Sequence, residues 1–206
     1  MNNTLITIKT ENRGEWLNLC RNGISASDAA AICGLNPYKT ILDVYNEKLG
    51  ADLTKEETES MRQIREFKEY AAERFSEKTG KKVRRRNRTL FSAQYPFMLA
   101  NVDRMIVAEN AGLECCITDT LHLKKFKNGE FPPECYAQCL HHMSVTGADK
   151  WYVAVLVINC DFRIFRLMRD DNEIEKLIEK ERSFWENNVI KYIPPKPDKN
   201  CNQTLF

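Results

Sequence analysis

The chain has 206 residues, 43% of them hydrophobic, with 31 Lys or Arg against 29 Asp or Glu and a net charge of +2. This length allows one sizeable core, so we expect a single domain over residues 1–198 and a polar tail over 199–206. No stretch approaches the ~20 consecutive apolar residues of a membrane span, and the first residues do not resemble a secretory signal. We therefore expect a cytoplasmic protein without a membrane partner. The near-zero net charge neither favours nor excludes nucleic acid.

Three short helices are predicted in the first fifty residues. "RGEWLNLCRNG" (13–23) and "TILDVYNEKLG" (40–50) carry apolar residues at helical spacing. Between them, "ISASDAAAICGLNPYKT" predicts a helix that Ser25 or Ser27 caps and that Gly34 ends.

A longer amphipathic helix is predicted over residues 54–80. Its apolar residues recur at helical spacing and predict one stripe that packs against the core: Met61, Ile64, Phe67, Ala71, Ala72 and Phe75.

The rest of the chain predicts a sheet with one helix inserted and one at its end. Strands are expected over 82–92, 97–109, 113–120, 151–159 and 162–168. A hairpin across "NAG" (110–112) joins the second and third strands, and helices are expected over 133–147 and 171–192. This order of elements predicts an α/β sandwich with a central mixed sheet.

The densest charge in the sequence is "GKKVRRRNR" (80–88), with six basic residues among nine. A positive stripe of this kind meets phosphates, but Lys and Arg also blunt exposed strand edges, so two interpretations stay open. On the first, the candidate DNA contacts are Lys81, Lys82, Arg84, Arg85 and Arg86.

Eight cysteines lie mostly in apolar segments, and we expect them to be reduced and largely buried. Cys135, Cys139 and His142 fall at i, i+4 and i+7 on one helix face, with Cys115 and Cys116 as further sulfur ligands. Zinc knuckles space their cysteines more compactly, so a core face is the favoured interpretation and a zinc site the lesser one.

Five blocks of the sequence resemble the YqaJ-type viral recombinase family, phage exonucleases related to lambda exonuclease. The blocks follow the family's order, and the resemblance covers about residues 12–198: "SDAAAICGLNPYKT", "QYPFMLANVDRMI", "GLEC", "YAQCLHHMSVTGADKWYVAVLV" and "FWENNV…IPPKPD". The resemblance implies the PD-(D/E)XK restriction-endonuclease-like fold, with a central mixed sheet flanked by helices. It implies less about activity, because function resides in the site and not in the fold.

In this family a hairpin supplies two carboxylates, a lysine follows the second by two residues, and an earlier helix supplies a glutamate. The carboxylates carry over to Asp103 in "NVDRM" and Glu114 in "GLEC". They are the expected ligands of Mg²⁺ or Mn²⁺, which prefer oxygen. Gln138 in "YAQCLHH" carries over to a position near the site.

Two catalytic positions depart from this pattern. Cys116 replaces the lysine, and a thiol that is neutral at pH 7 cannot act as a fixed cation beside water. "QIREFK" aligns with the family's "WGTLLE", which places Ile64 at a glycine and Lys68 at the metal-binding glutamate. At ~4 Å and an effective dielectric of about 20, this ammonium opposes a cation by about 4 kcal/mol per metal charge.

A third departure lies in "GISASD", where Ser25 and Ala26 replace two glycines of the family's "GIGGSD". Side chains here are expected to restrict backbone angles that glycine adopts freely. The resemblance implies that this turn helps to hold the DNA backbone or its terminal phosphate, and Arg21, Ser27 and Asp28 remain for that contact.

These departures predict a nuclease scaffold without its reaction: a phage or mobile-element protein of the bacterial cytoplasm that needs no cofactor. Its expected partners are duplex DNA ends, a phage single-strand annealing protein, or a host nuclease or defence complex that it inhibits. The alternative is an active 5′→3′ DNA exonuclease that uses Mg²⁺ or Mn²⁺. Its site would be rebuilt around a relocated lysine, with Lys68, Lys124 and Lys125 as the candidates.

Overall fold

The structure is a computed structural model, and it describes residues 5–51, 58–118, 132–158 and 161–196. Its strands are β1 (Leu5–Ile8), β2 (Val83–Arg85), β3 (Thr89–Ser92), β4 (Leu99–Ala100), β5 (Arg104–Ile106), β6 (Ala111–Thr118), β7 (Lys150–Val157) and β8 (Asp161–Met168). Its helices are α1 (Arg13–Arg21), α2 (Ala26–Ile32), α3 (Ile41–Lys48), α4 (Glu59–Thr79), α5 (Pro133–Thr146) and α6 (Asp171–Phe184), which a π-helical turn, η2 (Trp185–Val189), extends.

The strands form two sheets. A five-stranded sheet has the order β2-β5-β6-β7-β8, and a three-stranded sheet has the order β1-β3-β4. Only β6 and β7 pair in parallel within the described residues, and the other pairs are antiparallel. The predicted mixed sheet is therefore confirmed.

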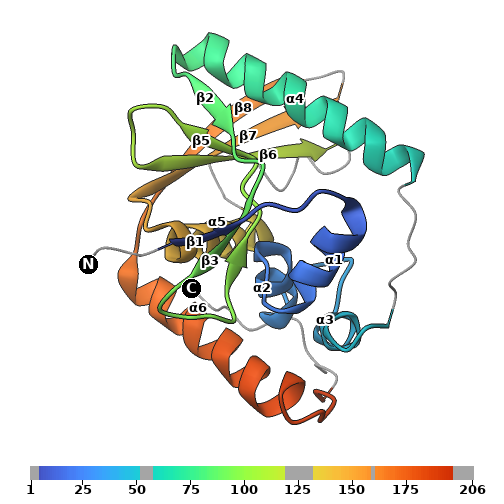
Figure 1. Cartoon of the computed structure of the whole chain (residues 1–206). Helices are drawn as coiled ribbons and strands as arrows, with labels where there is room; N and C mark the ends of the chain where they lie inside the picture. Colours follow the sequence, from blue (N-terminus) through green and yellow to red (C-terminus); the bar gives the residue numbers. More distant parts are fainter. Residues whose placement is uncertain (1–4, 52–57, 119–131, 159–160, 197–206) are drawn as a thin grey trace.

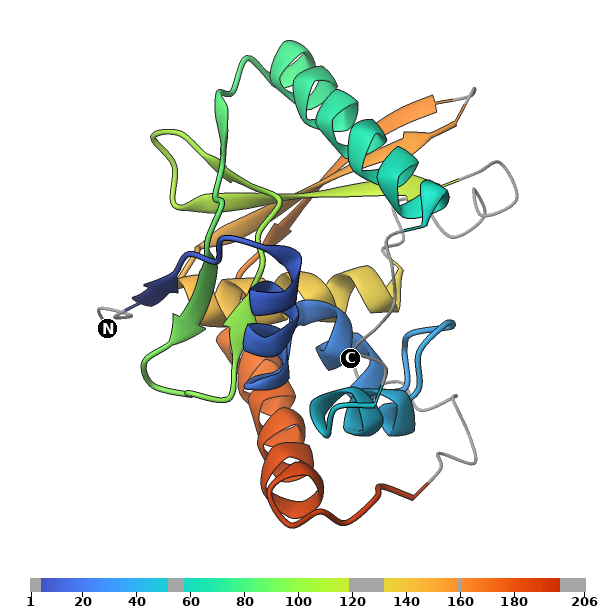
Figure 2. The same ribbon diagram turned by 45° about the vertical axis from the view of Figure 1, so that its right-hand side comes forward.

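Helices cover both faces of the larger sheet (Figures 1 and 2). The unbroken apolar run of β7 is typical of a strand buried on both sides. Trp151, Val153 and Val155 face one core with α5, α2 and α6, whereas Tyr152 and Ala154 face a second core under α4. Among the helices of the described residues, none is long and apolar enough to cross a membrane.

Local signals set the N-terminal helices as predicted. Ser25 caps α2 in a capping box with Asp28, and Thr40 caps α3 in the same way. Ser25 itself has an extended backbone, with φ −92° and ψ 170°. Ser25 therefore adopts an ordinary N-cap conformation that needs no glycine angle.

The apolar stripe predicted along the long helix is only half buried. Ala71, Ala72 and Phe75 lie in the core, but Met61, Ile64 and Phe67 are 47%, 44% and 38% exposed. Helical spacing predicted which face of α4 is apolar, but Ile64 and Phe67 on that face line a cavity beside the end of β6 and do not join the core.

The strand predictions need four further corrections. The expected strand over 82–92 is two strands, β2 and β3, which belong to different sheets, and the expected strand over 97–109 is likewise β4 and β5. The strand β1 was not predicted. The hairpin turn precedes its expected place, because β6 already begins at Ala111.

Candidate functional site

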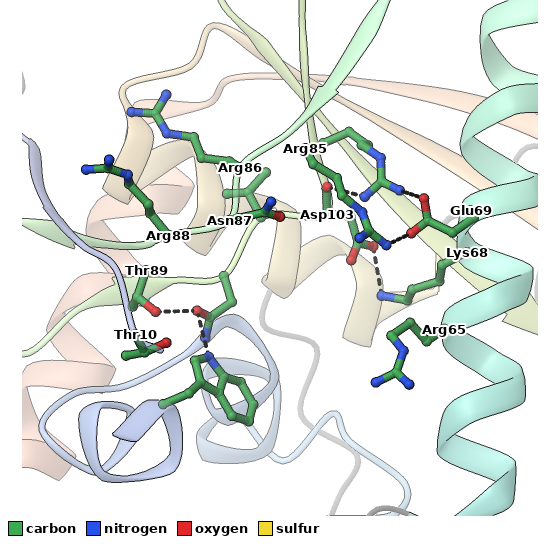
Figure 3. A pocket seen from close by; sticks show the side chains of 14 residues that line it. Thr10, Arg65, Lys68, Glu69, Arg85, Arg86, Asn87, Arg88, Thr89 and Asp103 are labelled. Carbon is green, nitrogen blue, oxygen red and sulfur yellow. Dashed lines mark hydrogen bonds and ion pairs between the residues drawn. The ribbon is translucent and has the colours of Figure 1, made fainter. Parts of the chain in front are cut away.

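The centre of the site is an ammonium between two carboxylates. Lys68 comes from α4, Asp103 from the bend before β5, and Glu114 from β6. The Nζ atom of Lys68 lies 2.7 Å from Oδ2 of Asp103 and 3.3 Å from Oε1 of Glu114. Figure 3 shows the lysine reaching across to Asp103. Sequence reasoning expected these three residues in one site, and the structure brings them together.

The three charged side chains of the site are partly buried. The side chains of Lys68, Asp103 and Glu114 are 30%, 20% and 12% exposed. Burial alone would raise the pKa of Glu114, but the charge of Lys68 and a contact with His142 lower it to about 2. Burial and the charge of Glu114 raise the pKa of Asp103. Burial alone would lower the pKa of Lys68, but the two carboxylates raise it well above its usual range, so the ammonium stays charged.

Backbone and ring contacts hold the carboxylates in place. The backbone N–H of Cys115 donates to Oδ2 of Asp103 at 3.0 Å. Nε2 of His142 lies 3.5 Å from Oε2 of Glu114. The His142 ring is stacked on the Trp151 ring, with centroids 4.9 Å apart, and this contact holds the imidazole in place.

A divalent cation does not fit this donor set as it stands. Asp103 and Glu114 supply the oxygen ligands that Mg²⁺ prefers, but the ammonium of Lys68 contacts both of them where a bridging cation would sit. The described part of the chain has no group of three or more His, Cys, Asp or Glu side chains arranged to hold a metal ion. We therefore derive no chemical step through a metal.

Cys116 lies two residues beyond Glu114 on β6, but its sulfur faces the start of α5. Its Sγ is 3.8 Å from Sγ of Cys135. This contact, together with burial, raises the pKa of the Cys116 thiol. A neutral thiol here supplies no cation to an attacking water. All six cysteines within the described ranges are free, and Cys160 and Cys201 lie outside them, as do Lys124 and Lys125.

A basic groove adjoins the site. It is a cavity of about 430 Å³ in which six basic side chains outnumber two acidic ones: Arg65, Lys68, Arg85, Arg86, Arg88 and Arg104 against Glu69 and Asp103. Figure 3 shows Arg86 and Arg88 on one side of this groove, and Arg65 with Lys68 on the α4 side. We call this cavity the arginine groove.

The basic residues predicted to contact DNA divide into two groups. Arg85 and Arg86 line the arginine groove, whereas Lys81, Lys82 and Arg84 do not. Lys81 instead pairs with Glu109. Arg85 pairs with Glu69, which also binds Arg104. The structure records no ion pair between Arg86 or Arg88 and any described residue, so these two offer uncompensated positive charge.

The turn at the start of α2 lies on the other side of the site. Ser27, Asp28, Lys48 and Gln138 line a cavity there with Lys68 and Glu114. Asp28 is buried, and its two carboxylate oxygens bind Lys39 and Lys48, each at 2.6 Å. Burial alone would raise the pKa of Asp28, but these lysines hold it well below its usual range. Asp28 is thus a buried ion-pair centre rather than an exposed DNA contact.

Arg21 lines neither of these two cavities, and its Nη2 atom is buried without a hydrogen-bond partner in the described residues. Sequence reasoning missed Arg65, Arg88 and His142 as residues near the site. Arg88 belongs to the basic run over 80–88, so the density of positive charge there could have identified it. Arg65 lies three residues before Lys68 on α4, and helical spacing would have placed both on one face.

Comparisons with known proteins agree on the family and fold. Residues 15–149 match the model of the YqaJ-like viral recombinase domain. The protein YqaJ of Bacillus subtilis (strain 168) is 37% identical over 181 residues, which cover 86% of this chain and 57% of that protein. The chain thus spans little more than half the length of this curated relative.

Two solved structures of exonucleases have a similar fold. The alkaline exonuclease LHK-Exo from Laribacter hongkongensis has a TM-score of 0.73 and 19% identity, with 87% of this chain and 93% of that one covered. A phage-related exonuclease from Haemophilus somnus 129PT has a TM-score of 0.63 and 12% identity, with 86% and 98% covered. At these identities the matches show the fold alone, and they confirm the predicted fold with its central mixed sheet and flanking helices.

Proposed function

We propose that this chain, which belongs to the YqaJ-like viral recombinase family, binds the DNA backbone without cutting it. The observation that carries the proposal is the position of Lys68, whose ammonium contacts both carboxylates, at 2.7 and 3.3 Å. A metal ion that bridged Asp103 and Glu114 would have to displace this charge. The Lys68 ammonium therefore neutralises the two carboxylates as a metal ion would, but it does not activate a water molecule.

The arginine groove supplies the binding half of the proposal. Arg86 and Arg88 lie on the segment between β2 and β3, and Arg65 faces them from α4. Phosphate oxygens accept hydrogen bonds from guanidinium groups in a two-pronged geometry. Since Lys68 and Asp103 also line the groove, a strand bound in it would lie beside the former reaction centre. A DNA end held there without cleavage would be shielded, which suits a protein of a phage or mobile element.

The cleavage test uses linear duplex DNA with 5′-phosphate ends. We expect the purified chain to leave it intact with Mg²⁺ or Mn²⁺ across a broad pH range. Degradation that Asp103→Ala abolishes would overturn the proposal and favour the active exonuclease with Lys68 as its relocated lysine.

The binding test is a salt titration. Each phosphate contact contributes a slope of about −0.9 in log K against log salt, so Arg86→Ala with Arg88→Ala should make the slope shallower by about 2. The matched control is Lys82→Ala with Arg84→Ala, two exposed residues of the same basic run that do not line the groove. If the chain binds no DNA, a protein partner, such as an annealing protein or a host defence complex, becomes the better proposal.

A further inference from the structure

The strand β8 forms one edge of the five-stranded sheet. It has eight residues, and within the described part of the chain it pairs only with β7. The strand at the other edge, β2, has three residues. Proteins often protect an edge strand by keeping it short or by placing proline in it, because its unpaired N–H and C=O groups can pair with another chain. The strand β8 has neither of these two protections.

The pairing with β7 shows which backbone groups of β8 point outward. The backbone N–H of Arg169 donates to the carbonyl oxygen of Asp149 at 2.9 Å, just beyond the last pair of the ladder. Hydrogen-bonded pairs alternate along an antiparallel ladder, so the odd-numbered residues of β8 bind β7 as Arg169 does. The N–H and C=O groups of Ile164, Arg166 and Met168 therefore point away from the sheet. Among the described residues, the structure records no hydrogen bond for these groups.

A lysine of α4 bounds this free stretch at its start. The Nζ atom of Lys78 lies 3.4 Å from the carbonyl oxygen of Phe162 and 5.4 Å from the centroid of its ring. The backbone N–H of Phe162 donates to Oδ1 of its neighbour Asp161 at 2.8 Å. The unoccupied part of the edge is therefore residues 164–168, which we call the β8 edge.

The side chains around the β8 edge are apolar and basic. Four apolar side chains are partly exposed while they pack against the two cores: Phe162, Ile164, Phe165 and Leu167. Arg166 is exposed, and the structure records no ion pair between it and any described residue. The phosphates of DNA cannot donate hydrogen bonds to the free carbonyl groups, whereas a polypeptide strand both donates and accepts. The β8 edge therefore suits a polypeptide.

Charge distinguishes between two kinds of polypeptide, a second copy of this chain and an acidic segment. Two antiparallel copies that pair through residues 164, 166 and 168 would place the Arg166 side chains directly opposite each other. Like charges directly opposite each other destabilise a strand pair. Asp161 does not compensate, because it pairs with Arg163 at 2.7 Å. An acidic segment would instead place a carboxylate opposite Arg166.

We propose that the β8 edge binds an extended acidic segment of a protein partner, which adds a strand to the sheet. Backbone hydrogen bonds to Ile164, Arg166 and Met168 supply the affinity, and the charge of Arg166 selects for acidic side chains. The inference goes beyond the proposed function and does not depend on it, because no residue of β8 lines the arginine groove.

The test uses a fluorescein-labelled peptide of alternating Val and Glu, with the eight-residue length of β8, and measures its binding to the intact chain by anisotropy. Side chains alternate between the faces of a sheet, so all the Glu residues can lie on the face that carries Arg166. We expect the peptide to bind and to slow hydrogen exchange of the Ile164 and Arg166 amides. The same peptide with every backbone nitrogen methylated should bind at least about tenfold more weakly.

Two variants separate backbone pairing from charge. Arg166→Pro removes an outward N–H that does not bind β7, so the sheet tolerates it, and it should weaken peptide binding about tenfold. Arg166→Glu keeps the N–H but reverses the charge, and it should weaken peptide binding about fivefold. Both variants should bind DNA as the intact chain does. Circular dichroism checks their fold, and Arg166→Glu with the exchange data decides the matter if Arg166→Pro does not fold.

The matched control is Arg84→Glu, which reverses an exposed charge on the other edge strand and should bind the peptide as the intact chain does. The inference is overturned if the plain peptide does not bind, if the methylated peptide binds equally well, or if Arg84→Glu causes an equal loss. Dimers of the intact chain in sedimentation, which Arg166→Pro separates, would assign the β8 edge to a second copy and also overturn it. Absence of DNA binding would overturn the proposed function alone.

Discussion

Lys68→Met removes the ammonium from the site but keeps an unbranched side chain of similar length. At an effective dielectric of about 20, separations of 2.7 and 3.3 Å correspond to gross attractions of about 6 and about 5 kcal/mol. Removing one partner of a buried ion pair costs about 3–5 kcal/mol. Because the lysine is 30% exposed, we expect the lower end of that range, a loss of about 3 kcal/mol in the free energy of unfolding.

The assay is urea unfolding with and without Mn²⁺. In the Lys68→Met variant Asp103 and Glu114 face each other without a cation, so Mn²⁺ should bind between them and restore stability. A ligand at 100 times its dissociation constant adds about 2.7 kcal/mol, which would recover most of the loss. The intact chain should not respond to Mn²⁺, because Lys68 already occupies the position.

The control is Lys82→Met, an exposed lysine outside the site, which should unfold at the same urea concentration as the intact chain. The reasoning is refuted if Lys68→Met is as stable as the intact chain. It is also refuted if Mn²⁺ stabilises the intact chain as strongly as the variant.

Asp28, Gly112 and the altered catalytic positions each give a further prediction. The pKa of Asp28 is held below its ordinary value of 3.8, so its ion pairs stabilise the fold above that pH and are lost as the pH falls. Asp28→Asn should therefore lower the free energy of unfolding at pH 7 and make stability fall less steeply below pH 3.8, as measured by acid titrations followed by circular dichroism. The same steepness of acid unfolding in the variant and the intact chain would contradict this. A Cβ on Gly112 would lie 2.2 Å from the Trp151 ring, so Gly112→Ala should cost about 1–3 kcal/mol in urea unfolding, whereas a neutral effect would show that the ring shifts freely. Lys68→Glu with Cys116→Lys should create Mg²⁺-dependent cleavage of linear DNA, with Ile64→Gly as an added change; folded variants that bind no metal would show that these positions are misassigned.

The sequence predicted those parts of the fold that local chemistry decides. Ser25 and Thr40 cap their helices because a short polar side chain suffices to bind the first free N–H groups. The apolar run over 151–159 predicted a strand, and the structure places it between β6 and β8 with a core on each face. Asp103, Glu114 and Lys68 were expected together only through a family resemblance, since nothing local relates residues so far apart in the chain.

The failures have a common physical origin in long-range contacts. Helical spacing identified the apolar face that contains Ile64 and Phe67, but it could not show that these two side chains line a cavity instead of the core. The basic run was predicted to lie in one strand, but β2 pairs with β5 in one sheet and β3 pairs with β1 and β4 in the other. No local signal predicts that Lys68 contacts both carboxylates, because this depends on how α4 lies across the sheet.

The chain passes between its two sheets beside the arginine groove. It leaves the five-stranded sheet after β2 for β3, and it returns from β4 to β5. Arg86 and Arg88 belong to the outgoing passage, whereas Asn101 and Asp103 belong to the returning one, and all four line the groove. A DNA strand bound in this groove would contact both segments that connect the two sheets. Bound DNA would therefore oppose a movement of one sheet away from the other.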